Sequence, residues 1–219
     1  VFYCEHNGEK REDLLAARSR AFKRKYRNVL RKFDANDGIT IGADAGPTYD
    51  PKLIDFLVQR KKQWTIERGK RGVFDEKETL AFYQAMARLA ADRGCLLLNW
   101  MRDQGQPFAV TLNFSHKKVV YGHTLAIDLD HAKYMPGIFL NMEALIWASE
   151  NGFEETNYME GEEEYKARFA KHARLIHEYA LARSLKGKAF LLAYRALRFY
   201  RAIKAHFDPR VRMASTGDT

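Results

Sequence analysis

Residues 119–140, VVYGHTLAIDLDHAKYMPGIFL, decide the fold. The first half alternates apolar and polar side chains, which predicts a strand over Val119 to Leu129. Pro136-Gly137 then starts a predicted helix that runs to Asn151, because Pro suits the first position of a helix. Residues 155–159 read as the next strand. A strand, a crossover helix and a strand form a β-α-β unit, which favours a parallel pair.

The segment before this unit has a different pattern. Residues 95–101 and 108–115 are strand-like, and short turns at 103–107 and 116–118 join them to the strand at 119. Three strands joined by tight turns form an antiparallel meander. Together with the β-α-β unit, the meander predicts an α/β (α+β) fold. We expect a mixed, mostly antiparallel sheet with helices on both faces.

Helices fill most of the remaining chain. Hydrophobic spacing, Asp50-Pro51 as a start signal and glycines as stop signals define them. We expect a basic helix over residues 9–33, helices over 51–69 and 75–94, a short helix over 162–170 and a long aromatic-rich helix over 185–207. Short strands are expected at residues 39–42 and 174–183.

Composition sets the class of protein. The chain has 219 residues and 46% hydrophobic content, enough for one large domain or a domain with an appendage. Two distant cysteines indicate no disulfide framework, so a reducing, cytoplasmic location is the default. No apolar run reaches the roughly 20 residues of a membrane helix. The chain opens on Val1 rather than Met, so we expect a piece of a longer protein.

The net charge of +9 is concentrated in two stretches. Residues 17–32 hold eight Lys or Arg and no acid, and Asp208 is the only carboxylate between residues 183 and 212. Basic surfaces attract nucleic acids, anionic lipid and the phosphates of coenzyme A (CoA). Solvated helix faces explain such charge runs equally well.

Two motifs carry chemistry. The turn Tyr134-Met135-Pro136-Gly137 feeds a helix, whose first N–H groups and dipole suit a phosphate. Taken alone, the turn is also an ordinary helix start. Gly161-Glu-Glu-Glu-Tyr-Lys166 follows a strand directly, at the sheet edge where α/β proteins bind ligands. Its alternative interpretation is an acidic first turn that compensates the helix dipole.

The order of elements and these motifs resemble a known family. The matching segments are Val119-Val-Tyr-Gly-His123, Asp128, Met135-Pro-Gly137, Leu145-Ile-Trp-Ala148 and Gly161 to Lys166. They resemble the GNAT-superfamily acyltransferases, in the branch of CelD-like polysaccharide-biosynthesis proteins and FemAB-like enzymes. The resemblance spans roughly residues 20 to 200.

The resemblance implies an acyl-CoA-dependent N-acyltransferase with no metal. In a GNAT fold the central parallel strands splay apart, and the pantetheine arm of CoA pairs with the exposed backbone of the first. Met135 stands where the family has Ser, which removes a hydroxyl from the phosphate site. The implied cofactor-binding residues are Leu125, Ile127, Asp128, Pro136, Gly137, Ile138, Phe139 and Leu140.

The resemblance also implies the catalytic residues. Glu163 matches the acid of the family motif and is the expected base or amine-orienting group. Tyr165 is expected to protonate the departing thiolate, and Lys166 to bind an anionic group of the substrate. Each also has a structural interpretation, Tyr165 as a packed aromatic and the other two as a surface ion pair.

Other side chains were weaker candidates. His123 and Asp128 lie five apart on one strand, which predicts opposite faces and no dyad. Cys95 begins a buried strand and is read as core.

The expected partner is a small-molecule amine on a sugar, amino acid or cell-envelope precursor. A homodimer or a preceding tandem GNAT half are further expected partners, and residues 1–37, 38–183 and 184–219 are the expected divisions of the chain. One alternative is a FemAB-like transferase that uses aminoacyl-tRNA in peptidoglycan synthesis and contacts tRNA through Arg18–Lys32. Another is a non-enzymatic basic module that binds nucleic acid or a membrane surface.

Overall fold

The computed structural model describes residues 1–36, 38–69, 72–161, 164–177 and 179–207. It divides the chain into two compact units, Val1–Leu175 and Ile176–Thr219. The second unit contains the long helix α7 (Leu185–Phe207), which agrees with the helix expected there. All other elements belong to the first unit, including the basic helix that the sequence sets apart at residue 37. The division of the chain into domains stays a prediction.

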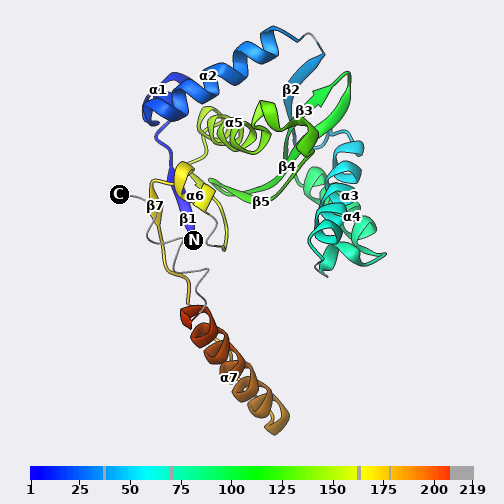
Figure 1. Cartoon of the computed structure of the whole chain (residues 1–219), viewed down its shortest axis with the longest axis vertical. Helices are drawn as coiled ribbons and strands as arrows, with labels where there is room; N and C mark the ends of the chain where they lie inside the picture. Colours follow the sequence, from blue (N-terminus) through cyan, green and yellow to red (C-terminus); the bar gives the residue numbers. More distant parts are fainter. Residues whose placement is uncertain (37, 70–71, 162–163, 178, 208–219) are drawn as a thin grey trace. The chain divides into compact units, whose positions relative to one another are not determined.

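A mixed sheet forms the centre of the first unit (Figure 1). Its order is β2-β3-β4-β5-β6-β1-β7, and among the described residues only β5 and β6 pair in parallel. The mostly antiparallel sheet and its parallel β-α-β unit are therefore confirmed. The strands are β1 (Phe2–Glu5), β2 (Ile39–Ala45), β3 (Leu96–Asp103), β4 (Gln106–His116), β5 (Val119–Ile127), β6 (Glu155–Asn157) and β7 (His172–Ala173).

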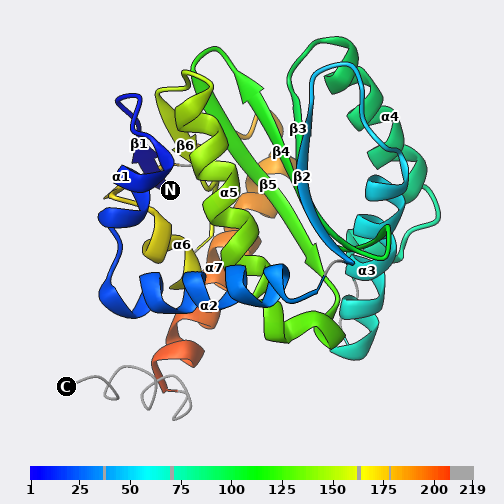
Figure 2. The ribbon, with the colours of Figure 1, turned by 90° about the horizontal axis from the view of Figure 1, so that it is seen from above.

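Helices cover both faces of this sheet. Figure 2 shows α5 on one side of strands β3 to β5, and α3 and α4 on the other. Helix α2 crosses over one end of α5 in the same view. The helices are α1 (Arg11–Ala16), α2 (Arg20–Asp34), α3 (Lys52–Glu67), α4 (Thr79–Asp92), α5 (Pro136–Glu150) and α6 (Glu164–Phe169), with 3-10 turns η1 (Val73–Asp75) and η2 (Leu129–Tyr134).

The α3/α4 face is held by aliphatic packing. Full burial of a Leu or Ile side chain contributes about 1.5–3 kcal/mol, so a few such residues fix both helices on the sheet. The Asp50 carboxylate accepts a hydrogen bond from the Lys52 N–H at 3.0 Å, which supports the predicted start of α3. The fully buried side chains include Leu53, Ile54, Leu57, Leu98, Val110 and Leu112.

The α5 face is held by aromatic rings and an ion pair. Helix α5 is apolar nearly all round and lies between the sheet and helices α1 and α2, as expected for such a helix. The ring of Tyr26 stacks on Phe139 at 4.8 Å, and Phe33 meets Phe139 edge-on at 5.0 Å. Arg11 donates to both carboxylate oxygens of Glu143 at 2.8 Å.

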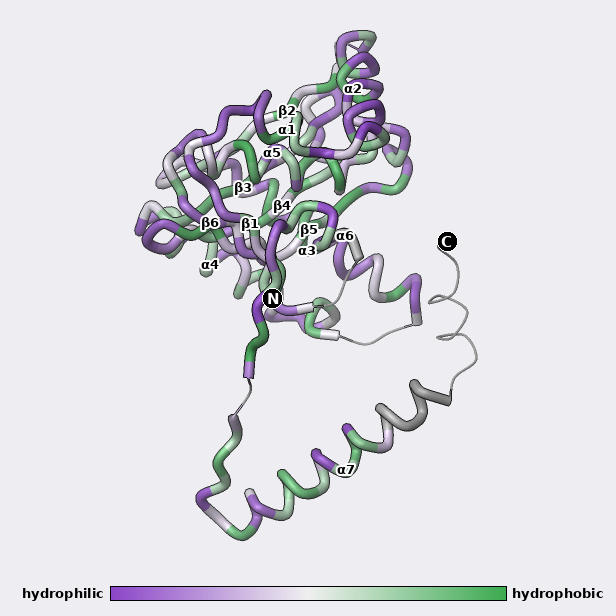
Figure 3. Tube along the Cα trace, turned by 90° about the vertical axis from the view of Figure 1, so that its left-hand side faces the viewer, coloured by the Kyte–Doolittle hydropathy of each residue, from purple (hydrophilic) through white to green (hydrophobic). Residues whose placement is uncertain are grey.

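Helix α2 has a second, exposed face. Figure 3 shows mainly hydrophilic residues along it, and its basic side chains point away from Tyr26, Val29 and Phe33, which are buried. The three buried residues form an apolar stripe by which α2 packs on the core, whereas Leu30 is exposed.

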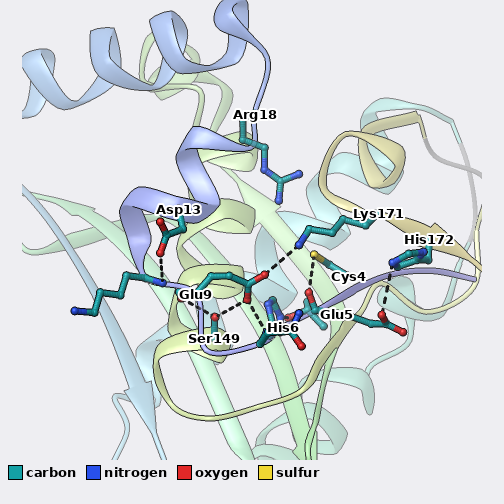
Figure 4. A network of polar contacts seen from close by, with 12 residues as sticks. Cys4, Glu5, His6, Glu9, Asp13, Arg18, Ser149, Lys171 and His172 are labelled. Atoms are coloured by element: carbon teal, nitrogen blue, oxygen red, sulfur yellow. Dashed lines mark hydrogen bonds and ion pairs between the residues drawn. The ribbon is translucent and has the colours of Figure 1, made fainter.

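Strand β1 and the segment after it fasten the far end of α5 (Figure 4). The Ser149 hydroxyl donates to the Glu9 carbonyl oxygen at 2.7 Å, and Lys171 donates to the Glu9 carboxylate at 3.1 Å. Burial raises the pKa of Glu9, but hydrogen bonds from the Asn7 N–H and from Lys171 outweigh burial and lower it to about 2. Glu9 is therefore a charged anchor for α5 at neutral pH.

Three sequence predictions need correction, and one strand was missed. The helix expected over residues 9–33 is two helices, because Ser19 caps α2 by accepting from the Phe22 N–H. Helix α4 begins at Thr79 rather than residue 75, after the turn η1. The strand expected over 174–183 is wrong, since β7 covers only His172–Ala173. Strand β1 was not predicted; its four residues are too few to show a period.

Candidate active site

Strands β5 and β6 part after a short parallel pairing. Val119, Val120 and Tyr121 pair with Glu155, Thr156 and Asn157, and β6 then ends while β5 continues to Ile127. The chain after β6 turns to β1, where the Tyr158 N–H donates to the Phe2 carbonyl. Among the described residues, no strand pairs with β5 on this side beyond Tyr121. Backbone N–H and C=O groups of β5 are therefore left for another partner.

A bulge lies beside the parting point. In the ladder with β4, Thr124 pairs with Leu112 and Gly122 pairs with Asn113, so His123 is an extra residue. A bulged strand has two residues opposite one, and the alternation of side chains shifts by one position.

The shift decides which side chains of β5 face which helices. Val120 packs with Ala148 of α5, so without a bulge Ala126 would face α5 too. Instead Ala126 packs among the α3/α4 residues, while Leu125 and Ile127 pack on the α5 face. His123 contacts Tyr83 of α4. The bulge thus places Ala126 on the same face of β5 as His123.

The turn between β5 and α5 is the predicted phosphate site. Met135 has left-handed backbone with φ 47°, and Pro136 begins α5 as expected. The Met135 carbonyl accepts from the N–H groups of Ile138 and Phe139, both at 3.0 Å. Because Pro136 has no N–H, the Gly137 N–H is the remaining donor of this turn. The helix end therefore offers one backbone donor and its dipole, fewer groups than the sequence suggests.

The implied cofactor-binding residues differ in how far they are buried. Leu125 contacts the turn, since a Cβ on Gly137 would lie 3.3 Å from its Cδ2. Phe139 and Leu140 are buried in the core. Pro136 is also buried, whereas Ile127 and Ile138 are half-buried. These placements leave the binding role of each residue a prediction.

Asp128 has protein partners. Its carboxylate accepts from Arg60 Nη2 at 2.8 Å, and Arg60 Nε donates to the Ile127 carbonyl at 3.0 Å. Asp128 and His123 both contact residues of α3 or α4, so the expectation of opposite faces is wrong, because the bulge lies at His123. The two still form no dyad, since each has its own partner.

A cationic pocket of about 470 Å³ lies beside the start of α5. Met135 and Ile138 line it on the α5 side. Arg18, Lys25 and Arg168 contribute positive charge from α2, α6 and the segment before α2. Arg18 Nη1 donates to the carbonyls of Arg168 and Phe169 at 3.1 and 3.2 Å, which holds α6 to the α1–α2 connection.

A second pocket of about 340 Å³ lies on the other face, between α3 and the end of β5. Arg60, Lys61, Trp64 and Arg68 of the α3 region line it with one acid, Glu67. The Arg68 guanidinium lies 4.2 Å from the Trp64 ring centre. This pocket combines positive charge with an aromatic surface.

The parting of a parallel pair beside a helix start agrees with the match to a protein family. Residues 20–167 match the model of the acetyltransferase (GNAT) domain. The chain belongs to this GNAT family. It is therefore a member of a family of acyltransferases, as the sequence resemblance implied. No curated protein sequence matches the chain.

The chain is also similar to solved structures. FemX matches with a TM-score of 0.55 and 9% identity over 74% of this chain and 53% of its own, so this chain spans about half of FemX. A conserved protein of unknown function from Bacteroides thetaiotaomicron has a TM-score of 0.49 and 16% identity, over 77% of this chain and 54% of its own. An aminoglycoside acetyltransferase from an uncultured soil metagenomic sample has a TM-score of 0.47 and 14% identity, over 69% and 99%.

The catalytic residues that the GNAT resemblance implies stay predictions. Glu163 lies outside the described residues, and for Tyr165 only the backbone, in α6, is described. Lys166 is buried, with Nζ donating to the Glu160 carbonyl oxygen at 2.5 Å. In this arrangement the Lys166 amine holds the loop before α6.

Sequence reasoning missed both pockets of this GNAT domain. Arg18 and Arg168 are 150 residues apart, so no local pattern links them. Arg60 is one of several basic residues on α3 and carries no motif. Among the described residues, no group of three or more His, Cys, Asp or Glu could hold a metal ion. No helix described is long and apolar enough to cross a membrane.

Proposed function

We propose that this GNAT protein transfers an acyl group from acyl-CoA to an amine of a sugar, amino acid or cell-envelope precursor in the cytoplasm. The observation that carries the proposal is the parting of β5 from β6 beside the first turn of α5. The parting leaves backbone groups of β5 for the amides of a pantetheine arm.

The cationic pocket supports the donor end of this proposal. A CoA diphosphate needs positive charge and N–H donors. Arg18, Lys25 and Arg168 supply the charge, and Gly137 supplies an N–H. The apolar side chains of Leu125, Met135 and Ile138 suit the neutral arm between diphosphate and thioester. The missing family Ser is compensated by these cations.

The amine acceptor approaches from the α3/α4 face. The amine nitrogen attacks the thioester carbon, the C–N bond forms, and the C–S electron pair leaves with the CoA sulfur. The nitrogen must lose a proton and the thiolate must gain one. We assign Glu163 to orienting or deprotonating the amine, Tyr165 to protonating sulfur, and Lys166 to an anionic group of the substrate.

Calorimetry with acetyl-CoA tests the proposal, with Gly137→Asp as the decisive variant. A carboxylate beside the phosphates should weaken acetyl-CoA binding by more than about 100-fold, through charge repulsion and loss of space. Gly137→Ala is the matched control, because its Cβ meets only the Leu125 side chain, at 3.3 Å. A folded Gly137→Asp protein with unchanged affinity would place the donor elsewhere.

One observation favours a second candidate, an aminoacyl-tRNA-dependent transferase of the FemAB-like kind in peptidoglycan synthesis. The exposed face of α2 carries Arg20, Arg24, Lys25, Arg27 and Arg31, and none forms an ion pair among the described residues. In the same calorimetry, bulk tRNA should then bind with an affinity that falls steeply with salt. Salt-sensitive tRNA binding without acetyl-CoA binding would favour this candidate.

A further inference from the structure

The bulged residue of β5 stands where the two substrates would meet. His123 lies two residues beyond Tyr121, the last residue of β5 that pairs with β6. Its contact with Tyr83 places it on the α3/α4 face, which also carries the pocket lined by Arg60, Lys61 and Trp64. Its side chain is exposed, so a ligand can reach it.

Few groups surround the His123 imidazole. The Tyr83 hydroxyl of α4 lies 3.3 Å from Nε2, and the Phe114 ring of β4 lies 5.7 Å from the imidazole ring. Lys61 of α3 adds a positive charge nearby. No carboxylate among the described residues contacts His123. Although the residue is exposed overall, the Tyr83 contact partly desolvates the imidazole, and this desolvation, followed by the charge of Lys61, lowers the pKa of His123 below its ordinary value. The imidazole is therefore neutral at neutral pH and able to accept a proton.

The Tyr83 hydroxyl orients the imidazole. Burial raises the pKa of Tyr83, so the phenol keeps its proton and can either donate to Nε2 or accept from an Nε2–H. In the tautomer whose Nε2–H donates to the Tyr83 oxygen, the lone pair lies on Nδ1, and this is the tautomer that the reaction requires. No described residue hydrogen-bonds to Nδ1. This is the arrangement of a general base oriented by a neighbouring group.

We propose that His123 is the base of the transfer reaction, accepting the proton of the acceptor amine on Nδ1, with Tyr83 as its positioning residue. The inference rests on the proposed acyl transfer. As the C–N bond forms and the C–S bond breaks, the amine proton moves to Nδ1. The thiolate leaves with the C–S electron pair, and the imidazolium returns its proton to water or to the thiolate. Glu163 then orients the amine rather than deprotonating it.

Steady-state kinetics of His123→Gln test the proposal. The assay follows thiol release from acetyl-CoA, with glucosamine and L-lysine as amine probes. Loss of a general base lowers kcat by about 100-fold or more, while the acetyl-CoA Kd stays within about twofold. His116→Gln is the matched control, since His116 is an exposed histidine at the hairpin end of β4. It should keep wild-type kinetics.

The pH profile separates a base from a structural residue. The titration of each probe amine is measured alone and divided out of kcat/KM. Wild type should then lose activity as pH falls through the lowered pKa of His123, because protonation removes the base. His123→Gln should lack this acidic limb, and added imidazole should restore part of the activity of His123→Ala. Tyr83→Phe should keep the limb with a smaller loss of kcat.

The outcomes separate this inference from the proposed function. If wild type neither binds acetyl-CoA nor acylates a probe, the proposed function fails and the inference fails with it. If wild type is active and His123→Gln keeps its acidic limb and kcat, only the inference is overturned. Loss of the limb in Glu163→Gln but not in His123→Gln would assign the base to Glu163.

Discussion

The two sides of the sheet carry pockets that are built in different ways. The α5 face is fastened by stacked rings and by charged groups that tie α1, α2 and α5 together. The α3/α4 face near the end of β5 is lined by long side chains on α3, with Trp64 40% exposed. A helix start that holds phosphates by its backbone requires fixed geometry, whereas an acceptor pocket can change through side chains alone. The contrast explains how one scaffold can keep its donor and vary its acceptor.

The basic N-terminal segment, which forms α1 and α2, packs against α5. Its apolar stripe supports Phe139, and Tyr26 donates to the Glu143 carboxylate. Burial and the charge of Glu143 raise the pKa of Tyr26, so the phenol remains a donor. The hydrogen bond to Glu143 also raises the pKa of Arg11. The segment is therefore a support for α5, in addition to any role of its exposed charges.

The largest effect should come from breaking this support with Glu143→Ala. The change leaves Arg11 and Tyr26 without their shared acceptor, which should cost about 2–3 kcal/mol of unfolding free energy. Urea denaturation measures the loss. Glu150→Ala, an exposed acid on the same helix, should change stability by less than about 0.5 kcal/mol. Equal effects of the two substitutions would show that α5 is held by packing alone.

A smaller effect should come from the anchor at the other end of α5. The folded-state pKa of Glu9 is depressed to about 2, so its stabilisation is present above the unfolded pKa and is lost as pH falls from about 4.5 to 2. Its side chain is 22% exposed, which reduces the contribution to about 1–2 kcal/mol.

Glu9→Gln measures this contribution. The variant should be less stable than wild type at pH 7, and the difference should shrink across that acidic window. Denaturation at a series of pH values follows it, and a difference that stays constant would contradict the assignment.

The smallest effect on stability, about 1 kcal/mol, should come from Arg60→Met on the open face. The substitution removes the bonds to the Ile127 carbonyl and to Asp128 but keeps most of the apolar stem. Because it lies on the acceptor side, it should raise the KM for the amine while the acetyl-CoA Kd stays within about twofold. A large loss of acetyl-CoA affinity instead would show that the two faces are not independent.

The β-α-β unit could be predicted because its signals are local. Alternation in residues 119–129 and Pro136 at the helix start depend on neighbours in the chain. The same holds for α7, whose helical spacing is local. Ser19 is a residue type that caps helices, and it does cap α2. The hydrophobic spacing on both sides of it nevertheless favoured one continuous helix.

The active-site surroundings could not be predicted because they depend on distant pairing. The bulge exists only in the register of residues 112–113 against 122–124, and it reversed the expected relation of His123 to Asp128. The sequence also suggested more free N–H groups at the start of α5 than the structure has. Two of them, those of Ile138 and Phe139, donate to the carbonyl of the left-handed Met135. Arg18 lines the cationic pocket, but its segment of the sequence shows a run of positive charge and no motif.

The bulge also bears on how such a site can change over time. Deleting His123 would bring Gly122 and Thr124 together, opposite the residues they already face, and no other side chain of β5 would change sides. A reactive side chain can thus be gained or lost at this point by one codon, with the rest of the sheet left in register. Elsewhere in a strand the same event would exchange the inner and outer faces.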